Sequence, residues 1–169
     1  NNGMLSGNTR DILIDGSNMY AANSGIYLST NGGFNWSLIS PALAATKLDK
    51  SGNIILVGTS NAGVYLSIDN GSTWTNPNSG LLANTIQDVK ISGTNLLAAT
   101  ASGVYISTNS GTTWSLSNLS LSSWCFYNVG TTLFAGTDPG GVYYSNDGGN
   151  TWIAANTGLT NMSVYSFAS

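Results

Sequence analysis

Short apolar segments alternate with turns of Gly, Asn and Ser along the whole chain. The apolar segments are rich in β-branched and aromatic residues, which favour β-strands, and the residues between them favour tight turns. No window shows the 3.6-residue periodicity of an amphipathic helix, and the helix formers Glu and Lys are absent or rare. This pattern predicts an all-β protein.

The alternation repeats four times. Each repeat contains the motif Gly-x-Tyr-x-Ser-x-(Asp/Asn)-x-Gly-x-(Thr/Asn)-Trp, preceded by two further apolar segments, and the closing tryptophans are 38, 40 and 38 residues apart. Four predicted strands in about 40 residues are the signature of a β-propeller blade. In the first repeat we expect strands at Arg10–Asp15, Met19–Ala22, Gly25–Ser29 and from about Trp36. The predicted blades are residues 9–40, 41–79, 83–119 and 122–156.

The turn inside each motif can satisfy its own polar groups. The Asp or Asn side chain can accept bonds from backbone N–H groups further along the turn, the Gly supplies a positive φ, and the Trp buries a large area between neighbouring sheets. We interpret these turns as structural corners. Their residues are Ser29, Asn31, Gly33, Trp36, Ser67, Asp69, Gly71, Trp74, Ser107, Asn109, Gly111, Trp114, Ser145, Asp147, Gly149 and Trp152.

The motif resembles the Asp box of the bacterial neuraminidase repeat proteins. Residues 67–74 and 145–152 carry the Asp form, whereas Asn31 and Asn109 replace the Asp in the other two copies. Within that family the chain is most similar to secreted bacterial non-catalytic repeat proteins, and to the propellers of photosystem assembly factors and sortilins. The resemblance covers the whole chain and implies a β-propeller with the boxes on its periphery. It implies a fold and not an activity.

Both ends of the chain fall inside the repeat period. The C-terminal residues 163–168 predict the first strand of a further blade, so that the array has four four-stranded blades plus one extra strand. Three arrangements are compatible with open ends: a segment of a larger ring, two copies joined in one eight-bladed ring, or copies paired head-to-tail through unpaired strand edges. The candidate assembly strand is Ser163, Val164, Tyr165, Ser166, Phe167 and Ala168.

Charge is scarce, which excludes several classes of function. Charged residues are 7% of the chain, with seven Asp, no Glu, no His and a net charge of −3. Four cations cannot neutralise a nucleic-acid backbone, and without His there is no Ser-His-Asp triad and no imidazole metal site. No apolar run is long enough to cross a bilayer. We therefore expect no cofactor, no metal, no nucleic-acid partner and no membrane insertion. The cations are Arg10, Lys47, Lys50 and Lys90.

We expect the chain not to be an enzyme. A sialidase site needs a cluster of arginines, a Tyr nucleophile and a Glu, and this chain has one arginine and no Glu. A pair of carboxylates for glycoside hydrolysis could come from the predicted inner strands, but we interpret these groups as polar residues of the propeller channel. They are Asp11, Asp15, Asp49 and Asp88.

The sequence is best interpreted as a non-enzymatic, extracellular or cell-surface interaction module. Its expected partners are protein, either further copies or the rest of its own propeller. The alternatives are a lectin-like propeller, with Trp124 as the stacking platform, and the non-catalytic part of a larger secreted glycoside hydrolase. Cys125 is expected to be buried and inert. Glycosylation triplets begin at Asn35, Asn70, Asn118 and Asn161, no more often than chance predicts.

Overall fold

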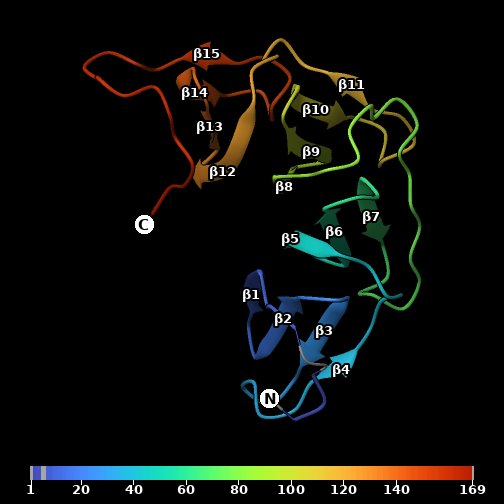
Figure 1. Cartoon of the computed structure of the whole chain (residues 1–169). Coiled ribbons are helices and arrows are strands. Elements are labelled where there is room, and N and C mark those ends of the chain that lie inside the picture. The colour runs from blue at the N-terminus through green and yellow to red at the C-terminus, as the bar shows by residue number, and fades with distance from the viewer. Residues whose placement is uncertain (1, 5–6, 169) are drawn as a thin grey trace.

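The computed structural model describes residues 2–4 and 7–168, and there all regular structure is β (Figure 1). Fifteen strands form four antiparallel sheets, which confirms the predicted all-β class. The first sheet contains β1 (Asp11–Asp15), β2 (Asn18–Ala22), β3 (Ile26–Ser29) and β4 (Ser37–Leu38). The second contains β5 (Ala45–Ser51), β6 (Ile54–Thr59) and β7 (Val64–Ser67). The third contains β8 (Asp88–Ser92), β9 (Asn95–Thr100), β10 (Gly103–Ser107) and β11 (Ser115–Leu116). The fourth contains β12 (Ser123–Val129), β13 (Thr132–Thr137), β14 (Gly141–Ser145) and β15 (Ile153–Ala154).

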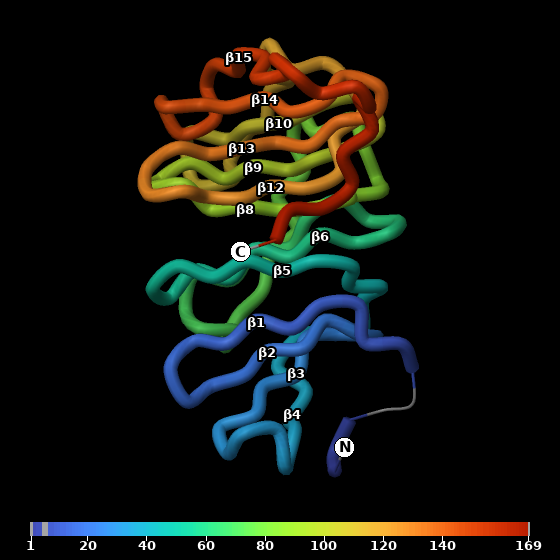
Figure 2. Tube along the Cα trace, turned by 90° about the vertical axis from the view of Figure 1, so that its left-hand side faces the viewer, coloured from blue at the N-terminus to red at the C-terminus, as the bar shows by residue number. Residues whose placement is uncertain are grey.

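The four sheets lie side by side along an open arc (Figure 1). The first strand of each sheet, β1, β5, β8 or β12, lies on the concave side, and consecutive first strands contact one another. Figure 2 views the molecule from this side, with the N-terminus at one end of the array. Every sheet is a meander in which consecutive strands pair through short turns. The chain order of the strands is therefore also their order from the concave side outward.

The second sheet has three strands, so the prediction of four strands in every repeat is wrong there. In the other sheets the third residue after the motif Trp donates its backbone N–H to the third strand, as Ile39 donates to Ile26 O and Ser117 to Val104 O. Pro77 stands at this position in the second repeat and has no N–H. The Asn76 side chain bonds Val64 O instead, and only an isolated bridge between Leu66 and Thr75 remains.

Buried side chains between adjacent sheets form the core. Between the first and second sheets they include Tyr20, Ile26 and Leu48, each of which is at most 6% exposed. Between the second and third sheets the cluster includes Leu56 and Trp114. Each internal sheet thus buries both faces, as expected for a stack of repeats in which each sheet contacts only its neighbours.

Residues 163–168 form no strand, so the predicted extra C-terminal strand is wrong as secondary structure. A strand assignment requires a neighbouring strand, and among the described residues none lies alongside this segment to pair with it. The segment nevertheless packs on the fourth sheet, because Val164 donates its N–H to Thr137 O at 2.9 Å. Ile86, which leads into β8, makes the same bond to Thr59 O of the second sheet. The segment therefore occupies the place where a following sheet would begin.

Candidate functional site

The first sheet has an apolar face on which none of the sheets in the described residues packs. We call it the leading face and define it by Met4, Ile12, Ile14, Met19, Tyr27 and Trp36. Ile12 pairs with Ala21, and Ile14 pairs with Met19, so these side chains share one side of the sheet. Ala21, Tyr27 and Trp36 form a small cluster there with Met4 and Met19. Ile12 is 53% exposed and Ile14 is 69% exposed.

The same positions are buried in the third sheet. Val89 pairs with Ala98 as Ile12 pairs with Ala21, and Ile91 pairs with Leu96 as Ile14 pairs with Met19. Val89 is 2% exposed and Ile91 is 8% exposed, because the second sheet packs against them. The leading face of the first sheet therefore corresponds to a face that packs on a neighbouring sheet elsewhere in the array.

The opposite end of the array carries an aromatic face. We call it the trailing face and define it by Tyr127, Phe134 and Tyr144 of the fourth sheet, which are in register across β12, β13 and β14. Phe167 of the C-terminal segment packs on it, with ring centroids 6.0 Å from Tyr127 and 6.5 Å from Phe134. The segment therefore covers part of this face.

Gly136 shows how closely the C-terminal segment is seated. A Cβ atom at Gly136 would lie 2.6 Å from the carbonyl oxygen of Val164 and 2.6 Å from the Cys125 sulfur. At the junction of the second and third sheets, a Cβ at Gly58 would lie 2.7 Å from the Ile86 side chain. Both glycines provide the space in which the following chain segment packs.

The aspartates of the first strands link neighbouring sheets. Asp11 Oδ2 accepts a hydrogen bond from Leu48 N at 3.0 Å, and Asp49 Oδ2 accepts one from Ile91 N at 2.7 Å. Asp88 Oδ2 accepts a hydrogen bond at 2.7 Å from Phe126 N, which belongs to the first strand of the fourth sheet. Each carboxylate belongs to one sheet and each donor to the next, so these groups hold the array together.

Three ion pairs accompany these bonds. Lys47 lies 3.8 Å from Asp11, and Lys90 lies 3.3 Å from Asp49. Lys50 lies 2.7 Å from Asp15. All four aspartates predicted on the first strands are thus engaged by backbone N–H groups or lysines.

Burial raises the pKa of Asp88 to about 6, because its carboxylate is removed from water and the bond from Phe126 N compensates only in part. Lys47 lowers the pKa of this carboxyl, whereas Asp11 raises it. A carboxyl with such a pKa could act as a general acid, but its bonding partners here are backbone groups. The Asp88 carboxylate therefore links the third sheet to the fourth.

The four motif turns share one hydrogen-bonding pattern. In the fourth sheet the Ser145 hydroxyl donates to Asp147 Oδ1 at 2.7 Å and accepts the Gly149 N–H at 2.8 Å. Thr151 donates its N–H to Oδ1 and its hydroxyl to Oδ2 of Asp147. These bonds lower the pKa of Asp147 to about 2, and equivalent bonds lower the pKa of Asp69. In the third sheet Asn109 reproduces the pattern, with its amide donating to Thr113 Oγ1.

Trp124 lies against the C-terminal segment. Its ring and the Tyr165 ring are in a T-shaped arrangement, with centroids 5.3 Å apart, and its buried Nε1 has no hydrogen-bond partner among the residues that the structure describes. Tyr165 also donates its hydroxyl to Asp138 Oδ2 at 2.9 Å. Tyr165 thus contacts the Trp124 ring, and the use of Trp124 as a sugar platform stays a prediction.

Several features of these surfaces could not be predicted from the sequence. Cys125 is buried as expected, but its position, with the sulfur 3.8 Å from Val164 O, was not foreseen. The asparagine of one glycosylation triplet, Asn118, bonds both the N–H and the C=O of Trp152. In the part of the chain that the structure describes, no three metal-ligating side chains gather, and no helix could cross a membrane.

Comparison with known proteins gives likeness at the level of fold. No protein-family profile matches the chain, and no curated protein sequence matches it. Among solved structures, it is similar to an ancestral GH74 enzyme, with a TM-score of 0.61 and 22% identity over 88% of this chain and 24% of the other. It is similar to YCF48 bound to D1 peptide, with a TM-score of 0.63 and 17% identity over 94% of this chain and 56% of the other.

It is also similar to the extracellular domain of the hybrid two-component system BT3049 from B. thetaiotaomicron. That likeness has a TM-score of 0.69 and 15% identity over 92% of this chain and 23% of the other. The chain thus spans between about a quarter and just over half of the length of these proteins. These neighbours are β-propeller proteins, and the identities are too low to transfer an activity. The four sheets have a β-propeller fold.

Proposed function

We propose that this chain is a non-enzymatic interaction module whose two end faces pack with further sheets of the same repeat. One observation carries the proposal: Ile12 and Ile14 are exposed at positions where Val89 and Ile91 are buried by a neighbouring sheet. Burying two such side chains stabilises an interface by about 1.5–3 kcal/mol each. An exposed apolar face of this kind marks an interaction site.

The internal junctions supply the template for that contact. At each junction, one sheet packs through the side that corresponds to the leading face. It contacts the side of the preceding sheet that corresponds to the trailing face. The exposed leading face and the aromatic trailing face of the fourth sheet are both apolar, and they correspond to the two sides of an internal junction. The C-terminal segment lies where an arriving first strand would lie, so it competes with a second copy for that position.

In this proposal the four sheets are blades of a propeller segment and the four motif turns are Asp-box corners. The turn bonds of Asp69 and Asp147 support this assignment. The first-strand aspartates bond backbone and lysines, which supports a structural role for them and the absence of catalysis. YCF48 has been solved with a bound peptide, and the BT3049 domain is extracellular, which supports protein partners and a location outside the cell.

Sedimentation velocity at increasing concentration tests the proposal. The full chain is compared with a chain truncated after Met162, and each is also made with Ile12→Ser and Ile14→Ser. We expect the truncated chain to associate more strongly than the full chain, because its trailing face is free. The double Ser variant should stay monomeric in both forms.

A matched control carries Leu82→Ser and Ile68→Ser, which remove two exposed apolar side chains outside both end faces. This control should associate like the unmodified chain. If the full and truncated chains are both monomeric at all concentrations, or if association survives Ile12→Ser and Ile14→Ser, the end faces are not assembly surfaces.

A further inference from the structure

An apolar cavity of about 300 Å³ lies between the second and third sheets, beside their motif turns. Leu66 of β7 and Leu96 of β9 line it, and both are buried in the core between these sheets. Ile54, at the start of β6, packs against the same core. Ile68, which follows β7, is 65% exposed and lines the cavity where it meets solvent. The cavity lies at an internal junction and is separate from both end faces.

The two isoleucines depart from the repeat. In every sheet the motif Ser pairs with a residue of the second strand, as Ser67 pairs with Ile55. The residues just outside this pair are Ile54 and Ile68 in the second sheet. In the other sheets both are polar: Asn18 and Thr30, Asn95 and Thr108, Thr132 and Asn146. Apolar side chains at otherwise polar positions near solvent indicate a site that binds an apolar group.

At the next junction a polar side chain bridges the corresponding gap. Asn95 of the third sheet donates its amide to the Gly148 carbonyl, in the motif turn of the fourth sheet, at 3.1 Å. Ser110 is the residue of the third sheet that corresponds to Gly148, three positions after the motif Ser. Ile54 stands where Asn95 does and has no donor for the Ser110 carbonyl. The gap between the second and third sheets therefore stays open.

The motif glycine beside the cavity has more space around it than its counterparts. A Cβ at Gly111 would lie 3.2 Å from the nearest atom, a methyl carbon of Leu66. The corresponding distance is 2.7 Å at Gly71 and 2.3 Å at Gly149, where side chains of the preceding repeat come closer. The junction between the second and third sheets is thus less tightly packed at this level than the other two.

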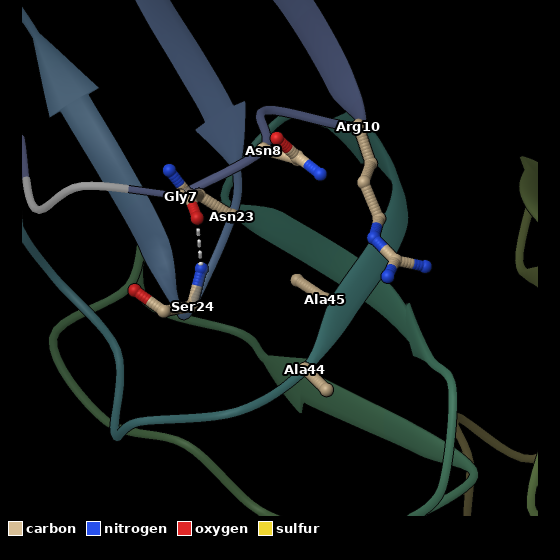
Figure 3. A pocket seen from close by; sticks show the side chains of 7 residues that line it. All are labelled: Gly7, Asn8, Arg10, Asn23, Ser24, Ala44 and Ala45. Carbon is tan, nitrogen blue, oxygen red and sulfur yellow. Dashed lines mark hydrogen bonds between the residues drawn. The ribbon is translucent and has the colours of Figure 1, made fainter.

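A second cavity, of about 240 Å³, opens at the rim between the first and second sheets (Figure 3). Asn23 and Arg10 lie on opposite sides of it, and the Asn23 oxygen accepts the Ser24 N–H at 2.7 Å. The Asn23 amide points away from Arg10, so these polar groups do not converge on one point. The apolar cavity differs in this respect, because its lining residues come from two sheets and surround one space.

We infer that the apolar cavity binds a small neutral molecule with an apolar body the size of one ring and a single hydroxyl group. The four aliphatic side chains supply the apolar surroundings. Thr94 and Ser110 line the cavity from the third sheet, and both are exposed, so their hydroxyls are available to a ligand. Mainly apolar walls with a few polar groups are typical of sites for small molecules.

The size and chemistry of the cavity exclude other ligands. At about 30 Å³ for each water molecule, it holds about ten waters, which is too small for a long acyl chain. None of the six lining residues is charged, so a charged ligand would lose water without gaining an ion pair. None is aromatic, so a sugar ring finds no stacking surface. The inference adds a ligand to the proposed interaction role and does not depend on assembly.

Methyl NMR of the full chain, labelled at Ile and Leu, tests this inference with four probes. p-Cresol has the ring and the hydroxyl, toluene has the ring alone, p-toluate carries a charge, and acetyl-tyrosine-amide presents the phenol on a peptide. We expect p-cresol to shift the signals of Ile54, Ile68 and Leu96 with saturation. Toluene should bind about three- to tenfold more weakly, because it lacks the hydrogen bond. p-Toluate should not bind, and the tyrosine peptide should bind more weakly than p-cresol, because the cavity has room for its ring alone.

Two variants and one control define the site. Ile54→Asn introduces the residue that the third sheet has, whose amide can bond the Ser110 carbonyl, and it should abolish p-cresol binding. Ile68→Thr should weaken p-cresol binding at least about fivefold, since it removes part of the apolar wall. Leu82→Thr removes an exposed apolar side chain outside the cavity and should leave the affinity unchanged. Thermal unfolding checks that each variant is folded.

Four results would overturn the inference: no saturable shift with p-cresol, equal binding of toluene and p-cresol, tighter binding of the tyrosine peptide, or unchanged p-cresol binding in folded Ile54→Asn and Ile68→Thr. Tighter binding of the peptide would assign the cavity to a side chain of a partner protein. Sedimentation keeps this test distinct from the proposed assembly. Ile54→Asn should leave association of the truncated chain unchanged, and Ile12→Ser with Ile14→Ser should leave p-cresol binding unchanged.

Discussion

The Asp88 carboxylate accepts the backbone N–H of Phe126 at 2.7 Å, and this bond joins the third sheet to the fourth. The pKa of Asp88 in the folded protein is about 6, above the model-peptide value of 3.8, because the carboxyl is buried. The folded state therefore binds this proton more tightly than the unfolded state does. Its contribution to stability is fully present below pH 3.8 and is lost as the pH rises through about 6.

We expect Asp88→Asn to remove this pH dependence. The neutral amide keeps an oxygen for Phe126 N and needs no proton. Urea unfolding between pH 4 and 7 should show the unmodified chain losing up to about 3 kcal/mol from this group, and the variant losing correspondingly less. Equal slopes for the two proteins would mean that Asp88 is ionised and unshifted in the fold.

Asp147 gives the opposite pH effect. Its folded pKa is lowered to about 2 by the bonds from Thr151, so its contribution is present above pH 3.8 and is lost as the pH falls toward 2. Asp147→Ala should cost about 1–2 kcal/mol at pH 7, since it removes the acceptor of three hydrogen bonds. Asp147→Asn should cost less than about 1 kcal/mol, because Asn109 makes the same turn. A similar loss for both variants in chemical denaturation would contradict this account.

Gly80 is required for close approach as well as for its positive φ of 83°. A Cβ there would lie 2.2 Å from the Trp114 carbonyl oxygen. Gly52 has a φ of 55° and no heavy atom within 4 Å of such a Cβ, so it is the matched control. We expect Gly52→Ala to cost about 1 kcal/mol and Gly80→Ala about 3 kcal/mol, measured by thermal unfolding. Equal costs would show that conformation alone determines the effect.

Ile91 and Ile14 occupy equivalent positions with different surroundings. Ile91→Ala should destabilise the chain by about 2–4 kcal/mol, because it leaves a cavity between the second and third sheets. Ile14→Ala should change stability by less than about 0.5 kcal/mol at concentrations where the chain is monomeric. A large cost at Ile14 in the monomer would show that this side chain is covered in solution.

Cys125 reports on the seating of the C-terminal segment. Burial raises the pKa of its thiol to about 11, and its sulfur lies against the Val164 carbonyl. Thiolate is the reactive form, so labelling with Ellman's reagent at pH 8 should be slow. Truncation after Met162 should increase the labelling rate at least about tenfold. An unchanged rate would mean that the segment leaves the fourth sheet readily.

The strands could be predicted from the sequence because they form by local pairing. Turns of a few residues join consecutive strands, so the repeat of Gly, Asn and Trp places each strand within a residue or two, as for β2 at Asn18–Ala22. The missing fourth strand of the second sheet was predictable in principle, since Pro77 occupies a donor position.

The contacts between sheets could not be predicted in the same way. The bond from Phe126 to Asp88 spans 38 residues, and its register depends on how two complete sheets pack.

The carboxylates of Asp11, Asp49 and Asp88 each accept a backbone N–H from the sheet that follows their own. The array therefore has a direction, and its two ends present different residues. A twofold axis would bring two identical surfaces together and could not reproduce the internal junctions. In the proposed assembly, copies would therefore join head-to-tail, all in the same orientation. The rotation from each sheet to the next would then decide whether the proposed assembly closes into a ring or continues as a filament.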